Sequence, residues 1–400
     1  MKLRDASWGV AVLVVAVLAF GLGVYTDQAF PDVMPYVVHH SAGRVDTTEL
    51  QQAIRVIQAD YVDGNVDPTK LSHGTVQGLI SSLGDPFSAY YDPAAYKRLQ
   101  DVYTGHYSGI GIYLSFTANA YPVITGTVPG SPAAAAGLLA GDQIVKVDGK
   151  DMKGLTSDQA STAIQGPNGS KVTLNIQRGV QNFSVTITRA EIQVPSVRST
   201  VITDQVLYVR LYQFTTTTTD ELHAALTSGL PGAKGMVLDL REDPGGFIDQ
   251  ADHVISEFVS SGETFELRDR SGTVDRHNVS GEHLAASVPL VVLVDANSAS
   301  AAEIVAGSLQ VHQRAKLVGT VTFGKGSVQQ DFPLNDGADI HLTVKRWYLP
   351  NGVTIDHKGL TPDVTVPLAN TSDQFDVQQP ANGYAKDAQL NSALSVLAAG

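Results

Sequence analysis

The first hydrophobic feature of the chain is an uncharged apolar run close to its N-terminus. The run occupies residues 8–25 and follows two basic residues, Lys2 and Arg4. A helix over this run would be about 27 Å long, close to the thickness of a bilayer core. The apolar cores of signal peptides usually have only about 7–15 residues. We therefore expect residues 1–30 to form a retained signal-anchor, with a cleaved signal peptide or a buried core helix as the alternatives.

This anchor would be a single transmembrane segment that crosses the membrane through residues 8–25. Because the basic flank of a first span stays in the cytoplasm, the rest of the chain would lie on the extracytoplasmic side. The sequence thus predicts a single-pass protein of the cell membrane.

Helical periodicity begins after a linker over residues 26–44. Apolar residues recur every three or four positions between residues 50 and 61, and Asp46 with Glu49 has the spacing of a capping box. A second helix is expected to begin at Pro68 and to end at Asp85-Pro86. Residues 31–106 are therefore predicted to be a linker and a helical region. Two short helices make a small domain, so we expect them to pack on another part of the chain or to form a homodimer.

From residue 109 onwards, apolar and polar positions alternate with the period of a β-strand. Two short helices interrupt this pattern, one after Gly130 and one capped by Thr156 or Ser157. Strands are expected over residues 109–114, 121–128, 143–149, 172–176 and 183–187. The pattern predicts a compact β-rich unit over residues 107–190.

Beyond this unit, strands and helices alternate. Apolar runs at 236–240 and 288–294 are nearly continuous, as expected of strands buried on both faces. A further strand is expected at 206–211, and helices near Asp220, at 249–260 and at 299–310. Residues 191–370 are thus predicted to form an α/β core whose loops at the carboxyl ends of the strands would carry a site. In residues 371–400, a polar tail precedes leucines at helical spacing, which indicates a docking helix.

Composition narrows the possible functions. The chain has 27 Lys and Arg against 40 Asp and Glu, a net charge of −13, so nucleic acid is not an expected partner. It has no cysteine, which excludes disulfides, cysteine-ligated metals and a thiol nucleophile. Apolar residues make up 43% of the chain, enough to bury several cores.

Two loops after predicted buried strands carry residues suited to acyl chemistry. Residues 244–246 are Pro-Gly-Gly, and paired glycines expose backbone N–H groups that can bind an oxyanion. Residues 295–303 place Ser300 at a strand-to-helix turn, where its hydroxyl can be exposed. Taken alone, the first loop is also consistent with a plain turn, and Ser298 or Ser300 with a helix cap.

A third loop places Lys325 between two glycines. Burial lowers the pKa of a lysine, and a neutral amine can accept the proton of a serine hydroxyl. Residues 319–326 nearly match a phosphate-binding P-loop, but Gly326 stands where that motif needs Ser or Thr, so an NTPase is a weak alternative. The pairing of Ser300 with Lys325 is the best candidate for catalysis.

Other catalytic sets have less support. The sequence has no G-x-S-x-G and no H-E-x-x-H motif, and its 11 histidines do not cluster with acidic residues at metal-ligand spacing. A Ser-His-Asp triad can assemble from distant residues, but nothing marks out one histidine. We therefore predict no metal and no cofactor.

A set of motifs in the family's order makes the chain resemble the carboxyl-terminal processing (tail-specific) serine peptidases. The central ones are Ser-Ala-Ser300-Ala-Ala-Glu303 and Phe-Gly-Lys325-Gly-Ser-Val-Gln329. The others are residues 83–93, 109–112, 238–241 with 244–246, 347–352 and 358–363. The resemblance covers about residues 45–400 and implies that the unit at 107–190 is a PDZ domain, inserted between the helical region and a serine peptidase core.

The resemblance also implies a role for each site residue. Ser300 would be the nucleophile, Lys325 the general base, and Gln329 the residue that holds the lysine amine in place. The oxyanion hole would combine the N–H of Ala301 with that of Gly245 or Gly246. In the PDZ domain, the matching loop is Gly109-Ile110-Gly111-Ile112, which would bind the C-terminal carboxylate of a peptide that adds as a strand.

The function implied is a membrane-anchored serine endopeptidase whose substrates are proteins or peptides with free C-termini. The alternative is a PDZ scaffold with an inactive protease body. Three residues depart from the family pattern: Asn297 stands in place of Gly, Ala302 in place of Ser, and Asp243 in place of Asn. The last of these puts a carboxyl group beside the expected oxyanion hole.

Overall fold

The computed structural model describes residues 46–399 except 118, 203–204 and 378–382. The chain divides into two units, residues 1–72 and 73–400. The expected anchor at residues 8–25 lies outside the described residues. Within the described ranges, no helix has the length and apolar character needed to cross a membrane.

The two predicted N-terminal helices are confirmed as α2 (Thr48–Asp60) and α3 (Pro68–Ser81). The cap of α2 is Thr47 rather than Asp46, whose carboxylate instead accepts the N–H of Thr48. Helix α3 ends four residues before the predicted stop at Asp85, in a turn that contains Gly84 at φ 65°. The sequence analysis missed α4 (Pro93–Thr104), whose first turn is capped by the Asp92 carboxylate.

The predicted β-rich unit is an antiparallel sheet with two short helices. The strand order is β3-β4-β5-β7-β8, and β6 pairs with β5. Its elements are β3 (Ile112–Ser115), β4 (Val123–Thr127), α5 (Pro132–Ala135), β5 (Gln143–Val147), β6 (Lys150–Asp151), α6 (Ser157–Ile164), β7 (Lys171–Arg178) and β8 (Gln181–Thr188). Ile124, Ile144 and Leu174 are fully buried in its core.

A two-stranded ribbon closes this unit at its base. β2 (His106–Gly109) pairs antiparallel with β9 (Ala190–Gln193), and Gly109 lies opposite Ala190. The chain therefore enters and leaves this unit at neighbouring points, which is the geometry of an inserted domain.

The larger core is built on a six-stranded sheet with the order β10-β11-β12-β15-β16-β19. All neighbouring strands are parallel except β10, which runs antiparallel to β11. The strands are β10 (Val197–Ile202), β11 (Val206–Leu211), β12 (Gly235–Asp239), β15 (Leu290–Val294), β16 (Lys316–Gly319) and β19 (Val364–Thr365). Strand residues alternate between the two faces, as the period of two requires.

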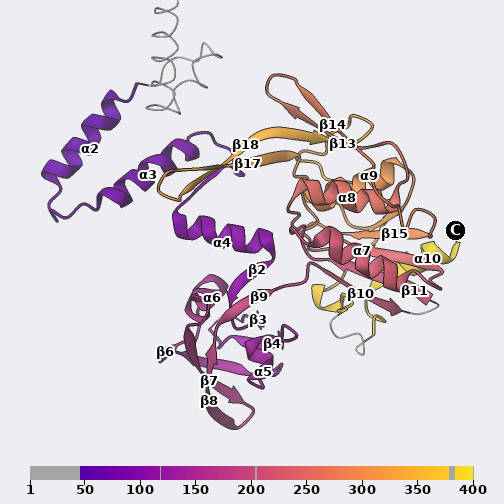
Figure 1. The fold of residues 1–400 in the computed structure, drawn as a ribbon, viewed down its shortest axis with the longest axis horizontal. Helices are drawn as coiled ribbons and strands as arrows, with labels where there is room; N and C mark the ends of the chain where they lie inside the picture. The colour runs from indigo at the N-terminus through magenta and orange to yellow at the C-terminus, as the bar shows by residue number, and fades with distance from the viewer. Residues whose placement is uncertain (1–45, 118, 203–204, 378–382, 400) are drawn as a thin grey trace, which may run out of the picture. The chain divides into compact units, whose positions relative to one another are not determined.

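Helices cover both faces of this sheet (Figure 1). α7 (Thr218–Gly229), α8 (Ile248–Phe258) and α9 (Ala301–Val311) share one apolar core with Leu207 and Leu238. The C-terminal helix α10 (Ala388–Ala399) packs against the other face through Leu390 and Ala393. The predicted strands and helices of this region, including the docking helix, are confirmed.

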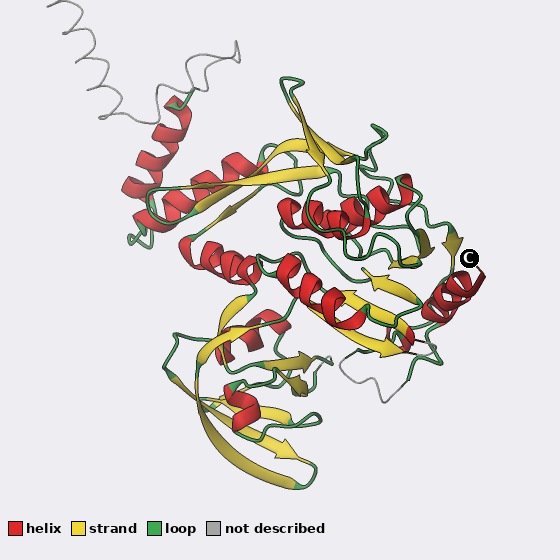
Figure 2. Ribbon diagram, turned by 45° about the vertical axis from the view of Figure 1, so that its right-hand side comes forward, coloured by secondary structure: helices red, strands yellow, loops and turns green. Residues whose placement is uncertain are grey.

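A second sheet lies beside the first and was not anticipated. Its order is β1-β18-β13-β14, and β17 pairs with β18 to form a long hairpin (Figures 1 and 2). The strands are β1 (Ala89–Tyr91), β13 (Glu263–Asp269), β14 (Val274–Asn278), β17 (Ser327–Pro333) and β18 (Asp339–Tyr348). The loop that contains Lys325 (residues 319–326, the lysine loop) leads directly into β17, so this hairpin positions Lys325.

Candidate active site

The glycine loop (residues 244–246) and the serine loop (residues 295–303) meet because they follow neighbouring parallel strands, β12 and β15. Side chains tie the two loops together. The Ser298 hydroxyl donates to the Leu240 carbonyl at 2.7 Å, and the Asp295 carboxylate accepts the Glu242 N–H at 3.0 Å. Ser298 therefore has a structural role, and Ser300 is the serine of this loop that faces the cavity.

Ser300 occupies the N-cap position of α9 with a strained backbone, φ 55° and ψ −116°. A positive φ in a residue with a Cβ costs of order 1–3 kcal/mol and recurs at functional sites. The turn leaves Ser300 8% exposed, at the cavity wall. The strained turn therefore holds the Ser300 side chain at the cavity wall.

Gly245 and Gly246 allow the glycine loop to approach the serine closely. A Cβ at Gly245 would lie 2.8 Å from the Ser300 Cβ and 2.8 Å from the Ala301 nitrogen. A Cβ at Gly246 would lie 2.1 Å from the Phe214 carbonyl oxygen. Both positions have positive φ, 92° and 147°, so only glycine fits.

The three N–H groups expected in the oxyanion hole are not equivalent. Within the described part of the chain, the N–H groups of Ala301 and Gly246 have no acceptor. The N–H of Gly245 donates to the Asp243 carboxyl at 2.8 Å. The N–H groups of Ala301 and Gly246 are therefore open to a ligand. The N–H of Gly245 is bonded to Asp243, one of the three residues that depart from the family pattern.

Asp243 is fully buried, and its second carboxyl oxygen has no hydrogen-bond partner among the described residues. Burial raises the pKa of this carboxyl well above its usual range, and Asp239 adds to the shift, while the Gly245 N–H and Arg210 oppose it. A neutral carboxyl has nearly the shape and charge of the asparagine that it replaces, so Asp243 preserves the loop.

The lysine loop is anchored to the serine loop by Glu303. Its buried carboxylate accepts the N–H of Ser300 at 2.9 Å and the N–H of Lys325 at 2.9 Å. It also accepts the Gly324 N–H at 2.7 Å and the Thr322 hydroxyl at 2.5 Å. One side chain therefore sets the separation of the two proposed reacting residues.

The environment of the Lys325 amine suits a base. Burial lowers its pKa from the ordinary value, against the opposing influence of Asp85 and Glu303. Within the described residues the amine makes no hydrogen bond or ion pair, and the centroid of the Phe87 ring lies 5.1 Å away. Trp347 fixes the loop by donating its indole N–H to the Lys325 carbonyl at 2.8 Å.

Gln329 lies on β17, in the same cavity as Lys325. Its amide nitrogen donates to the hydroxyls of Ser327 and Thr343, each at 3.0 Å. In the described residues, no hydrogen bond joins Gln329 to the lysine amine. Its role in holding that amine stays a prediction.

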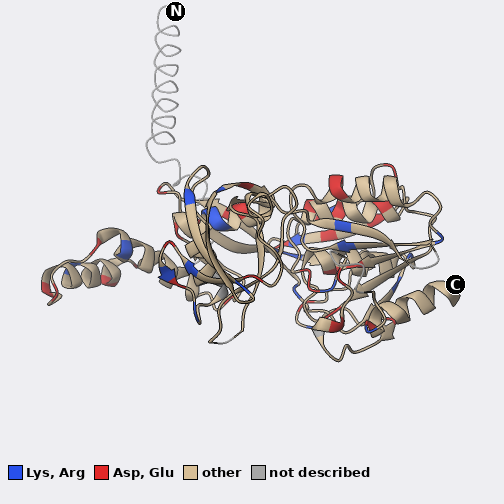
Figure 3. Ribbon diagram, turned by 90° about the horizontal axis from the view of Figure 1, so that it is seen from below, with Lys and Arg blue, Asp and Glu red and all other residues tan. Residues whose placement is uncertain are grey.

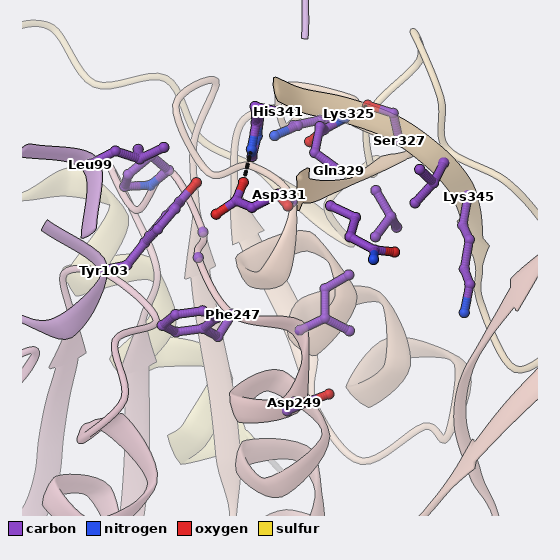
Figure 4. Close-up of a pocket in the computed structure, with 18 of the residues that line it drawn as sticks. Leu99, Tyr103, Phe247, Asp249, Lys325, Ser327, Gln329, Asp331, His341 and Lys345 are labelled. Carbon is purple, nitrogen blue, oxygen red and sulfur yellow. Dashed lines mark hydrogen bonds and ion pairs between the residues drawn. The ribbon is translucent and has the colours of Figure 1, made fainter. Parts of the chain in front are cut away.

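These groups share a cavity of about 770 Å³. Lys325, Gln329, Asp331 and His341 line one wall in Figure 4, while Tyr103 and Phe247 come from other elements. The cavity thus brings together a serine, a desolvated amine, open N–H groups and an apolar surface. Acyl transfer uses groups of these kinds.

The loop 109–112 lines a separate groove of about 230 Å³ next to α6. Burial raises the pKa of the Tyr107 hydroxyl to about 12, and the nearby backbone N–H groups of Ile112 and Gly111 oppose the shift. Backbone N–H groups of this loop therefore lie near an oxygen atom. Ile110 itself is only 1% exposed and belongs to the core as much as to the groove.

The sequence analysis assigned no role to Glu303 or Phe87. For Glu303 a signal was available, because Ser300-x-x-Glu303 has the spacing of a capping box. For Phe87 no local signal exists, since its approach to Lys325 is a tertiary contact.

One observation corrects the sequence analysis on metal-ligand clusters. The chain does bring a histidine together with acidic residues: ligand atoms of Asp331, Asp339 and His341 lie within 4.8 Å of one another. The spacing was missed because it spans a hairpin rather than a helix turn.

Three family models match consecutive parts of the chain. One described as peptidase family S41 matches residues 205–366, one described as a PDZ domain matches 123–178, and one described as the N-terminal domain of the activating protease CtpB matches 34–95. Each match lies inside one of the ranges predicted from the sequence.

Curated relatives agree. A carboxy-terminal-processing protease of Bartonella bacilliformis is 40% identical over 321 residues, which cover 78% of this chain and 73% of the relative. The chain belongs to peptidase family S41. The carboxy-terminal processing protease CtpA of Bacillus subtilis is 35% identical over 331 residues, 82% of this chain and 70% of the relative. The S41 chain is accordingly a C-terminal processing serine peptidase with a PDZ domain.

Solved structures share the fold. The photosystem II D1 C-terminal processing protease has 27% identity and a TM-score of 0.51, covering 85% of this chain and 99% of that one. A putative S41 protease from Bacteroides fragilis has a TM-score of 0.56 at 20% identity, over 86% and 96% of the two chains.

Proposed function

We propose that this S41 peptidase is anchored in the cell membrane, selects substrates by their free C-terminus and cleaves them with a Ser300/Lys325 dyad. The observation that carries the dyad is the shared cavity, in which a strained serine and a desolvated amine come from adjacent loops held by one carboxylate. No metal or cofactor has a part in the proposed reaction.

In the proposed mechanism, the Ser300 hydroxyl attacks the scissile carbonyl and gives its proton to the neutral amine of Lys325. The Ala301 N–H, with a glycine N–H, stabilises the oxyanion, a contribution of about 3–4 kcal/mol per donor in the best-studied case. The C–N bond then breaks, and the lysine ammonium protonates the leaving amine. Water hydrolyses the acyl-enzyme by the same steps in reverse. Within the described residues, no hydrogen bond occupies the side-chain oxygen of Gln329, so it can accept one from the amine.

The PDZ domain would select the chain end. A PDZ groove takes an extended peptide as an added strand and binds its carboxylate with backbone N–H groups. The N–H groups of Gly111 and Ile112 and the apolar groove beside them support this use. Acidic and basic residues are interspersed along the described ribbon in Figure 3, and the net charge is −13, so recognition of a negative chain end has to be local.

The membrane anchor at residues 8–25 and the extracytoplasmic location rest on the sequence pattern. The proposed homodimer through the N-terminal helices is supported by apolar side chains that the described chain leaves exposed there. Val56 and Tyr61 are 51% and 53% exposed. Exposed apolar residues in a group favour a partner surface.

A matched pair of peptides tests the proposal. We expect a substrate with a free apolar C-terminal residue to be cleaved faster than its amidated form, and Ser300→Ala and Lys325→Ala each to abolish cleavage of both. Equal cleavage of the two peptides would refute selection by the C-terminus while leaving the dyad intact. Activity that survives in either variant would refute the dyad.

A further inference from the structure

The hairpin β17–β18 gathers three potential metal ligands on one of its faces. Asp331 lies directly opposite His341, and Asp339 precedes His341 by two positions, so the side chains point the same way. Their ligand atoms lie within 4.8 Å of one another. Asp331 and His341 also line the active-site cavity (Figure 4).

Asp339 is the member of this cluster that ordinary packing does not explain. The residue is fully buried, and neither carboxylate oxygen has a hydrogen-bond partner within the described ranges. An unpaired buried carboxylate is costly unless a proton or a cation neutralises it.

Of the three side chains, Asp331 and His341 are hydrogen-bonded to each other, and Asp339 has no partner among the described residues. The His341 Nδ1 lies 2.5 Å from the Asp331 carboxylate, in a hydrogen bond that leaves Asp339 out. Tyr91 of β1 packs its ring edge-on to His341, with 5.9 Å between the centroids, and so closes another side. The side chains of His341 and Asp331 are 13% and 30% exposed, at the cavity wall.

We propose that Asp331, Asp339 and His341 bind one divalent transition-metal ion at the edge of the active-site cavity. Two carboxylates and one imidazole suit Zn²⁺ or Mn²⁺ better than Ca²⁺ or Mg²⁺, which take oxygen ligands in larger number. Zinc bonds of about 2.0–2.2 Å require the three ligand atoms to close in from their present spread, and the ion replaces the proton shared by His341 and Asp331. A water molecule would fill the position that faces the cavity.

The ion would link β17 to β18 two residues after Gln329. The proposed reaction assigns it no role, so its expected effect is on the stability of the hairpin rather than on the Ser300/Lys325 chemistry. The inference therefore stands apart from the proposed function and can be tested in an inactive enzyme.

The test uses the full chain with Ser300→Ala, freed of metal by a chelator and dialysed. Zn²⁺, Mn²⁺ and Ca²⁺ are added separately, and calorimetry, elemental analysis and thermal unfolding are recorded. We expect one Zn²⁺ or Mn²⁺ per chain and a rise in Tm of about 2–5 °C with saturating ion. Asp339→Asn and, separately, His341→Gln should weaken binding by roughly tenfold or more. Glu282→Gln, which removes an exposed carboxylate elsewhere, should bind like the parent.

Two results would overturn the proposal: absence of saturable Zn²⁺ and Mn²⁺ binding, or equal binding by the parent and both ligand variants. Because His341 is partly exposed, His341→Gln is expected to fold even where a change at the buried Asp339 does not. Binding of Ca²⁺ in preference to both transition metals would also contradict the assigned class of ion.

Discussion

At the scale of single residues, the geometry of the site depends on two buried carboxyl groups, those of Glu303 and Asp243. Glu303 joins the backbone of the serine loop to that of the lysine loop, and Asp243 holds the glycine loop. Each carboxyl group is fully buried and accepts at least one backbone N–H, so removal of the acceptor leaves a buried donor unpaired. Substitutions at these positions therefore act on catalysis through geometry.

Glu303→Gln should lower kcat by at least about tenfold, because an amide presents N–H groups to donors that need an acceptor and a buried unpaired donor costs about 1–3 kcal/mol. Steady-state kinetics and Tm are the measurements, with the exposed Glu282→Gln as the control. A variant with normal kcat and a changed KM would show that Glu303 does not set the dyad geometry.

The pH dependence of turnover should report Lys325. The neutral amine is the active form and burial lowers its pKa, so kcat/KM should rise with pH through an apparent pKa below the ordinary lysine value. Lys325→Arg should be inactive, because a guanidinium does not act as a base near neutrality. Lys345→Arg, at the wall of the same cavity, should keep its activity. An active Lys325→Arg enzyme would contradict the mechanism.

Asp243→Asn should stabilise the protein increasingly as the pH rises from about 4. The pKa of Asp243 is higher in the folded chain than its usual value of 3.8. Stability from this group is therefore fully present below pH 3.8 and declines as the unfolded chain loses the proton that the folded chain keeps. Asparagine removes that loss. Tm measured from pH 4 to 8 should show a widening gap of a few degrees, and a constant gap would refute the raised pKa.

At the scale of elements, the C-terminal helix α10 is tied to the strand that carries the glycine loop. Arg241, just after β12, is fully buried and donates to Asp387 at 2.9 and 3.0 Å and to Gln389 at 3.0 Å. Asp239 binds the same guanidinium from the other side at 2.6 Å. The C-terminal tail is thereby bonded to Arg241, which lies 146 positions before Asp387 and close to the glycine loop in sequence.

Asp387→Ala should destabilise the protein by about 3–5 kcal/mol, since it leaves part of a buried guanidinium unpaired. Denaturant unfolding and peptidase activity are the measurements, and the exposed Ser395→Ala is the control. A loss of activity without a loss of stability would show that α10 acts on the site in some other way.

At the scale of the whole molecule, one two-stranded ribbon connects the PDZ domain to the rest of the chain. Gly109 and Ala190 lie opposite each other on β2 and β9, so residues 110–189 can be removed and the ends joined by a short glycine link. We expect this deletion to erase the preference for a free C-terminus and to lower the rate, because delivery of the substrate is lost.

The comparison is the rate on free and amidated peptides, before and after the deletion. A preference that survives would place C-terminal recognition in the peptidase core. A rate that rises would mean that the PDZ domain inhibits until it is occupied, contrary to the activating role that we favour.

The sequence alone predicted three strands of the six-stranded sheet, β11, β12 and β15, and most helices, and it pointed to Ser300 and Lys325 as the candidate dyad. Buried parallel strands produce continuous apolar runs, and glycine-rich loops follow them, so the signal is local. Helix α4 and the hairpin β17–β18 were missed because their half-exposed residues alternate weakly, and their pairing partners lie far away in sequence.

Only the tertiary structure decided how the loops meet. It showed that Glu303 bonds to both the serine loop and the lysine loop, that Asp243 accepts the Gly245 N–H, and that Phe87 lies beside the lysine amine. It also showed that Asp339 is buried and has no hydrogen-bond partner among the described residues. These facts concern desolvation and contacts between distant segments. A pattern along the chain records which residue types are present, whereas the cost of burying a charge depends on what surrounds it in space.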